Sequence, residues 1–249
     1  MANEWASAMT HWYDKAGRPV YEVERADKKG MRPTTLRDAR KMGLVPSVTG
    51  IIRCAAAPQL EKWKRDQVLI AALTLPRMPE ETEQSWLARV EQDWQEQGRA
   101  AADRGTAIHA AVEQHFRSEA FEPEFTEWVS SVNDAIIKGC GPQRWNAERS
   151  FADARGYGGK TDLHSGEWVV DVKTKDSPLS PVIYDEHLMQ LAAYREGLNI
   201  PGARCGILFV GRDQPKAILA EASPSELQRG WEMFNALLTF WQAQKAYRP

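Results

Sequence analysis

The run WVVDVKTK, residues 168–175, constrains this chain more than any other feature of its sequence. Its apolar character is typical of a buried strand, yet an aspartate and a lysine stand in its middle. Asp171 and Lys173 are two positions apart, so on a strand their side chains point to the same face. Because burying either charge without a partner is costly, this segment predicts a polar site inside the fold.

A second aspartate lies a few residues before this strand. Asp162 follows a glycine turn, Gly156–Gly159, on a strand predicted over Lys160–His164 that pairs with an antiparallel strand over Glu167–Lys175. A metal ion that meets both carboxylates, with the ammonium of Lys173 beside them, removes the cost of burial. Mg²⁺ takes one or two carboxylates together with waters and phosphate oxygens. Such a site suits phosphodiester hydrolysis, in which water is activated and developing negative charge is stabilised.

Periodicity predicts the order of the other elements as helices, three strands, a helix, two strands and a final helix. The predicted helices and further strands cover Pro58–Leu75, Pro79–Ser118, Phe125–Lys138, Asp185–Leu198 and Pro224–Tyr247 (helices), and Gln143–Ala152, Cys205–Val210 and Lys216–Glu221 (strands). Within the second helix we expect a break or bend near Gly98 or Gly105.

The first third of the chain carries shorter signals. Asp14–Gly17 is a turn-forming cluster between two β-like runs, which predicts a hairpin. The run TTLRDARKMG predicts a short helix that Gly43 ends. Pro46–Ile52 fits either a strand or the start of a buried helix, because periodicity does not separate the two over so few residues.

Length and composition bound the fold and its environment. With 249 residues the chain is long enough for one substantial core, and we expect a single domain in which a hairpin and helical region (1–140) precedes an α/β core (141–249). No apolar run approaches the roughly 20 residues of a membrane helix, and the first 14 residues lack the basic start and apolar core of a secretory signal. Three scattered cysteines match no zinc or disulfide spacing, which fits a protein in a reducing cytoplasm. We expect their side chains to be buried in the protein: Cys54, Cys140 and Cys205.

Charge is unevenly distributed along the chain. Residues 1–65 hold 13 Lys/Arg and 7 Asp/Glu, whereas the remainder holds 19 and 27, so net charges of +6 and −8 add up to the overall −2. A basic N-terminal third is compatible with a phosphate-contacting surface. It is equally compatible with an ordinary solvated face, so charge alone does not decide between them.

Four ordered motifs accompany the strand on which the site is predicted. They are Leu44-Val45-Pro46-Ser47-Val48-Thr49, Gly105-x-x-x-His109, Gly159-x-x-Asp162 with Asp171-Val172-Lys173, and Gln190-x-x-x-Tyr194. Together they resemble the PD-(D/E)XK nuclease superfamily, and within it the exonuclease branch of RecB-type nuclease domains, Cas4 and the mitochondrial genome maintenance exonuclease. The resemblance spans about residues 44–198. The proline that precedes the first aspartate in the superfamily is replaced by Thr161.

The resemblance implies a restriction-endonuclease-like α/β fold, with a mixed sheet of about five strands flanked by helices and an N-terminal helical arch over the site. It implies two Mg²⁺ or Mn²⁺ ions, with metal ligands at His109, Glu148, Asp162, Asp171 and the Val172 carbonyl. The implied catalytic residues are Lys173 with Asp162 and Asp171, and Gln190 and Tyr194, which orient the lysine or contact DNA. Expected DNA contacts are Ser47, Thr49, Arg53, Thr174 and Lys175. Cluster-bearing relatives use four cysteines, so no iron–sulfur cluster is expected here.

Each motif residue has a plainer interpretation when taken alone. A single His109 fits a core histidine, and Glu113, four residues later, fits either a helper on the same helical face or a surface acid. Gln190 and Tyr194 also fit a helix flank packed on a sheet. The triplet Gly159-Lys160-Thr161 is not the end of a phosphate-binding P-loop, because Ala154 stands at the required first glycine and a strand follows.

The sequence therefore predicts a metal-dependent exonuclease that hydrolyses DNA from its ends, in phage or bacterial recombination, replication or repair. A helical arch favours single-stranded DNA or frayed duplex ends as the substrate. A single-strand annealing or recombination protein is a possible partner, and the site of action is the cytoplasm, that of the bacterial host if the protein is phage-encoded. The alternatives are a structure-specific endonuclease and a DNA-binding protein with an inactive site.

Overall fold

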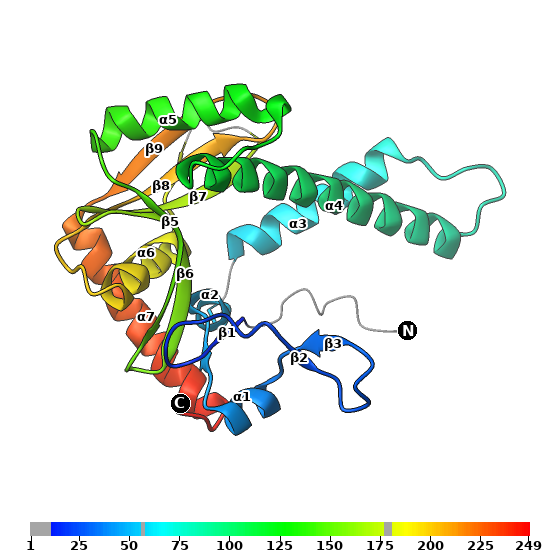
Figure 1. The fold of residues 1–249 in the computed structure, drawn as a ribbon. Coiled ribbons are helices and arrows are strands. Elements are labelled where there is room, and N and C mark those ends of the chain that lie inside the picture. Colours follow the sequence, from blue (N-terminus) through cyan, green and yellow to red (C-terminus); the bar gives the residue numbers. More distant parts are fainter. Residues whose placement is uncertain (1–10, 56–57, 177–180) are drawn as a thin grey trace.

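A five-stranded mixed β-sheet with helices on both faces forms the centre of the molecule (Figure 1). The computed structural model describes residues 11–55, 58–176 and 181–249. Residues 1–10, which belong to the stretch predicted not to be a secretory signal, lie outside the described residues. The sheet and its flanking helices confirm the predicted α/β class and the predicted number of strands.

The strands of the sheet follow one another in chain order from edge to edge. They are β5 (Asn146–Asp153), β6 (Tyr157–His164), β7 (Trp168–Lys175), β8 (Arg204–Gly211) and β9 (Ala217–Ala222). The β7–β8 pair is parallel and the other pairs are antiparallel. A parallel pair needs a long crossover connection, and α6 (Asp185–Gly197) lies in that connection.

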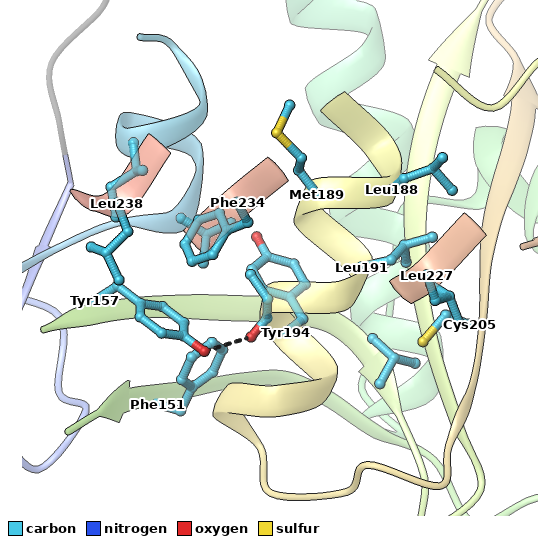
Figure 2. Close-up of a cluster of buried hydrophobic side chains, with 14 of the residues drawn as sticks. Phe151, Tyr157, Leu188, Met189, Leu191, Tyr194, Cys205, Leu227, Phe234 and Leu238 are labelled. Atoms are coloured by element: carbon cyan, nitrogen blue, oxygen red, sulfur yellow. Dashed lines mark hydrogen bonds between the residues drawn. The ribbon is translucent and has the colours of Figure 1, made fainter. Parts of the chain in front are cut away.

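Two helical layers bury the two faces of the sheet. Helices α4 (Glu83–Phe116) and α5 (Thr126–Cys140) pack against one face, and α6 with α7 (Pro224–Gln244) covers the other. Each face has its own hydrophobic cluster. Figure 2 shows the cluster beneath α6 and α7, where aromatic side chains meet those of the first two strands of the sheet: Phe151, Tyr157, Tyr194 and Phe234.

The N-terminal segments form a small lobe beside the sheet. Its elements are β1 (Trp12–Tyr13), β2 (Glu22–Glu24), β3 (Met31–Pro33), α1 (Leu36–Met42), β4 (Val45–Pro46) and α2 (Val48–Ile52). The predicted turn over Asp14–Gly17 is present, since the Gly17 amide donates to the Asp14 carbonyl at 2.9 Å. Across this turn Tyr13 forms an antiparallel bridge with Pro19, and the Val20 amide donates to the Trp12 carbonyl at 2.8 Å, so the predicted hairpin is present in a short form. In addition, β1 pairs with β4, and β2 pairs with β3.

Two local predictions in this lobe are settled by backbone capping. Gly43 ends α1 in the left-handed conformation, with φ 68°, as the sequence predicts. Both interpretations of Pro46–Ile52 hold in part, because a short strand passes directly into a short helix. Ser47 marks the change: its hydroxyl accepts the Gly50 amide at 3.0 Å and caps α2.

Helix α3 (Pro58–Thr74) packs against α4, and the pair projects from the body of the molecule (Figure 1). These are the helices predicted to arch over the site. The predicted break in α4 is wrong: the helix runs without interruption through Gly98 and Gly105. A glycine costs a helix only about 1 kcal/mol, which the other residues of so long a helix outweigh.

The glycine turn, the cysteines and the hydropathy of the helices can also be compared with the sequence. The glycine turn is shorter than predicted, since β6 already begins at Tyr157 and only Gly156 in this stretch has a positive φ, 93°. Cys140 and Cys205 are buried as expected, whereas Cys54 is only partly buried. Over the described residues, no helix has both the length and the apolar character that crossing a membrane requires.

Candidate metal centre

The candidate site lies where β6 and β7 separate. Each strand has eight residues, but their register covers only Leu163 opposite Val170 and His164 opposite Val169. Beyond these pairs the Asp162 carboxylate takes the place of the neighbouring strand: its Oδ2 atom accepts the Val172 amide at 2.7 Å. The opening of the sheet therefore holds a carboxylate at its apex.

Helix α4 brings His109 to this carboxylate. The Nε2 atom of His109 lies 3.1 Å from Oδ2 of Asp162. One helical turn earlier, a Cβ atom on Gly105 would lie 2.6 Å from the Thr174 hydroxyl oxygen. A glycine at this position lets α4 approach β7 closely, which gives the Gly105-x-x-x-His109 spacing a physical reason.

Glu148 adds a second carboxylate from the edge strand β5. The flanking pairs Ala147–Leu163 and Arg149–Thr161 place Glu148 directly opposite Asp162. Its backbone has φ 55°, a left-handed conformation that is uncommon for residues other than glycine. The side chain of Glu148 is only 4% exposed.

Three potential ligand atoms converge in the opening of the sheet. One atom each from His109, Glu148 and Asp162 lies within 4.8 Å of the other two, and we call these residues the metal-compatible group. Imidazole nitrogen and carboxylate oxygen together suit a divalent cation. The three residues could hold a metal ion, and their donor set does not identify which one.

A second set of residues lies deeper and is bonded internally. Asp171 is 1% exposed. Its Oδ2 atom lies 2.7 Å from the Lys173 ammonium, and its Oδ1 atom accepts the Gln190 amide at 2.8 Å. Gln190 also donates to the Tyr194 hydroxyl at 2.9 Å. We call Asp171, Lys173, Gln190 and Tyr194 the inner network; it connects β7 to α6.

A glycine on β6 makes room for the inner network. A Cβ atom on Gly159 would lie 2.8 Å from the Tyr194 ring and 3.0 Å from the Phe151 ring. Both contacts are closer than real Cβ atoms tolerate without movement of the neighbours. Gly159, which the sequence places in a turn, therefore serves inside a strand to let Tyr194 pack against the sheet.

The two aspartates differ in their proton affinity. Burial raises the pKa of Asp171 to about 6, against the lowering influence of Lys173 and with a further raise from Asp162. Burial also raises the pKa of Asp162, but the bond from His109 and the charges of His109 and Lys173 outweigh it, so the pKa is lowered. Asp162 is therefore the carboxylate that stays ionised most readily.

Neighbouring carboxylates favour the charged forms of Lys173 and His109. Burial lowers the pKa of Lys173, but the carboxylates of Asp171 and Asp162 outweigh burial and raise it. Burial likewise lowers the pKa of His109, and its bond with Asp162 raises it above the usual value. A histidine must be neutral to bind a metal, so a cation would displace a proton from His109.

The site opens into a groove of about 520 Å³. It is lined by Ala102, Gly105, Thr106, His109, Ala110, Glu113, Glu148, Lys160, Asp162, Val172, Lys173 and Thr174. The metal-compatible group and Lys173 thus face one cavity, whereas Asp171, Gln190 and Tyr194 support it from below. Glu113 lines the groove and also forms an ion pair with Arg117 at 2.9 Å.

The predicted DNA contacts are spread over a wider area. Thr174 lines the groove, and Lys175 follows it on β7 with its ammonium over the Phe209 ring. Ser47 is buried as the cap of α2, Thr49 lies 3.3 Å from it, and Arg53 is exposed just after that helix. Of these five residues Thr174 lines the groove and the other four do not, and their contact with DNA stays a prediction.

Sequence reasoning missed Lys160 as a member of the site. Its ammonium forms an ion pair with Oε2 of Glu148, and its side chain lines the groove. In the sequence analysis this lysine appears only within the triplet Gly159-Lys160-Thr161, which is not the end of a P-loop. The available signal is its position two residues before Asp162 on the same strand, which places both side chains on one face.

Comparisons with known proteins add little to this geometry. No family model matches the chain, and no curated protein sequence matches it. Among solved structures, one from Eubacterium rectale named "putative exonuclease" aligns with TM-score 0.42 and 13% identity, over 57% of this chain and 68% of that one. A protein named SSO0001 aligns with TM-score 0.25 and 18% identity, over 42% of this chain and 55% of the other. Likenesses at this level do not assign an activity.

Proposed function

We propose that the protein is a metal-dependent nuclease that hydrolyses DNA phosphodiester bonds in the groove between α4 and the opening of β6 and β7. One observation carries the proposal: His109, Glu148 and Asp162 converge on one point while the charged Lys173 lines the same groove. A divalent cation beside a lysine suits phosphodiester hydrolysis, because together they can polarise the water and the phosphate. The resemblance of the sequence motifs to the PD-(D/E)XK superfamily and its restriction-endonuclease-like fold supports the same reaction.

The metal-compatible group is proposed to hold Mg²⁺ or Mn²⁺. Asp162 is the central ligand, since its pKa is lowered and it lies between His109 and Glu148. The carbonyl of Val172, which lines the groove, is a further candidate. When bound, the ion supplies Lewis-acid activation of the phosphate and of water.

Asp171 and Lys173 are proposed to act as a fixed pair. Both Asp171 oxygens already have partners, Lys173 and Gln190, so coordination of a second ion by Asp171 would compete with these contacts. Gln190 and Tyr194 hold Asp171, and Asp171 in turn holds the lysine. The role of Lys173 is to orient the attacking water or to stabilise the charge that develops on the phosphate.

Digestion from a DNA end is the proposed form of the reaction. Helix α4 lines one side of the groove, near the point where the projecting α3–α4 pair leaves the body of the molecule, and a site that a helix closes on one side is proposed to admit a single strand or a frayed end more readily than a duplex. The motif resemblance supports the same choice, together with action in the cytoplasm of a bacterium, in recombination or repair beside a single-strand annealing protein.

Labelled DNA tests this function directly. Linear single-stranded DNA, linear duplex and a covalently closed circle are incubated with the protein in Mg²⁺, in Mn²⁺ and in EDTA. The proposal predicts metal-dependent loss of the linear substrates with the circle left intact. Cleavage of the circle would identify an endonuclease, and binding without cleavage in either metal would identify a DNA-binding protein with an inactive site.

A further inference from the structure

Lys160 lines the groove, but the reaction proposed above does not use it. It precedes Asp162 by two residues on β6, and its ammonium forms an ion pair with Oε2 of Glu148. The lysine side chain is 37% exposed, whereas that of Glu148 is 4% exposed. The ion pair therefore joins a cation that reaches solvent to an anion that does not.

The backbone around Glu148 restricts the position of its carboxylate. It is held opposite Asp162 by the pairing of β5 with β6 and has a left-handed backbone conformation. Its Oε2 atom is buried, and apart from the ion pair with Lys160 it has no hydrogen-bond partner among the described residues. A buried carboxylate without a compensating positive charge is costly, so Lys160 supplies the charge that the metal-compatible group needs in the free protein.

The two lysines of the groove are held in different ways. Lys173 pairs with Asp171, which Gln190 fixes from α6. Lys160 instead pairs with Glu148, a carboxylate that a bound cation would also use. Because a lysine stem is long and flexible, Lys160 is the lysine that can leave its partner when another positive charge arrives.

Lys160 shares the groove with a second lysine, Lys173. The anion that the proposed reaction brings between them is a DNA phosphate.

We propose that Lys160 is a displaceable phosphate-binding residue: it neutralises Glu148 in the free protein and moves its ammonium to a phosphate of the substrate strand once a divalent cation has taken over that charge. This inference rests on the proposed nuclease function. It predicts opposite effects of one substitution on two ligands, since loss of the Lys160 charge helps the metal and harms the DNA.

Calorimetric titration with Mn²⁺ in the absence of DNA tests the first half. Lys160→Met is expected to bind Mn²⁺ about threefold to tenfold more tightly than the wild type, because a competing half-exposed charge is gone. Lys160→Arg keeps the charge, and Lys138→Met removes an exposed lysine from α5, so both are expected to bind like the wild type. Equal or weaker binding by folded Lys160→Met would overturn the proposal. Lys160→Gln replaces it if the methionine variant does not melt cooperatively.

Fluorescence anisotropy with a single-stranded oligonucleotide tests the second half. In a Lys173→Met background with Mn²⁺ present, adding Lys160→Met is expected to weaken binding and to reduce the slope of log affinity against log salt by about 0.7, the value for one lost phosphate contact on a single strand. An unchanged slope would contradict phosphate binding. If the wild type binds no Mn²⁺, the proposed function fails together with this inference. If the wild type binds Mn²⁺ and cuts DNA while Lys160→Met behaves identically in both assays, only this inference fails.

Discussion

The metal-compatible group and the inner network lie side by side but are built in opposite ways. His109, Glu148 and Asp162 come from three separate elements, α4, β5 and β6, and they face an open groove. The inner network comes from β7 and α6 alone, and hydrogen bonds and an ion pair join its polar atoms to one another. The first set presents its imidazole and carboxylate groups to the groove, whereas Asp171, Gln190 and Tyr194 of the second set do not line it. The difference separates binding of an ion from orientation of the reacting groups.

The largest expected effect separates these two roles. Lys173→Met should reduce hydrolysis of labelled DNA by about 10²- to 10³-fold, because a charge aimed at the reacting atoms is lost. Its Mn²⁺ affinity should stay within about threefold of the wild type, since Lys173 does not belong to the metal-compatible group. A parallel loss of metal binding in calorimetry would show that the two sets do not act separately.

The next effect concerns the stability of the protein in acid, and it depends on His187 at the start of the helix that carries Gln190 and Tyr194. His187 lies in the first turn of α6, and its Nδ1 atom accepts the Tyr184 amide at 3.2 Å, which a nitrogen that carries a proton does not do. Burial, together with the charges of Lys173 and Lys175, lowers the pKa of His187 to about 4. The unfolded chain binds this proton near pH 6.5, so the stabilisation is fully present above pH 6.5 and is lost as pH falls toward 4. Over that window the free energy of unfolding should drop by about 3 kcal/mol from this group.

Urea unfolding at pH 7, 5.5 and 4 measures this loss. His187→Asn can still accept the amide bond through its side-chain oxygen but does not titrate, so its stability should fall less steeply over the same range. Parallel curves for the two proteins would show that His187 is not the responsible group.

The smallest effect concerns the approach of α4 to the sheet. Gly105→Ala should weaken Mn²⁺ binding by about tenfold, because its Cβ atom meets the Thr174 hydroxyl and pushes His109 away from Asp162. Thr174→Ala removes the oxygen that is met, so the double variant should regain most of the affinity. Calorimetry on the two single variants and the double variant decides; no recovery would mean that Gly105 acts in another way.

Much of the fold could be predicted from the sequence because the signals were local. The alternation and apolar runs of residues 143–175 predict β5, β6 and β7 to within a few residues, and helical spacing predicts α5, α6 and α7. The pairing of Asp171 with Lys173 follows from the period of a strand. These features depend on neighbours in the chain, which a single sequence displays.

The rest depended on contacts between distant segments. A glycine in the sequence often marks a helix break or a turn, but Gly105 and Gly159 each make room for a side chain from another element. The partner of β1 lies more than 30 residues away, in Val45–Pro46. Lys160 forms its ion pair with Glu148, which lies opposite Asp162 on the neighbouring strand and has an uncommon backbone conformation. Spacing along the chain indicates only that Lys160 shares a strand face with Asp162, and it does not show the other contacts.

A metal centre in this groove can be tested by calorimetric titration of Mn²⁺ into the wild type and Asp162→Ala. We expect saturable binding to the wild type and its loss when the central carboxylate of the metal-compatible group is removed, with thermal melting showing that the variant is still folded. Absence of binding to the wild type, or binding of equal affinity to folded Asp162→Ala, would contradict a metal centre in this groove.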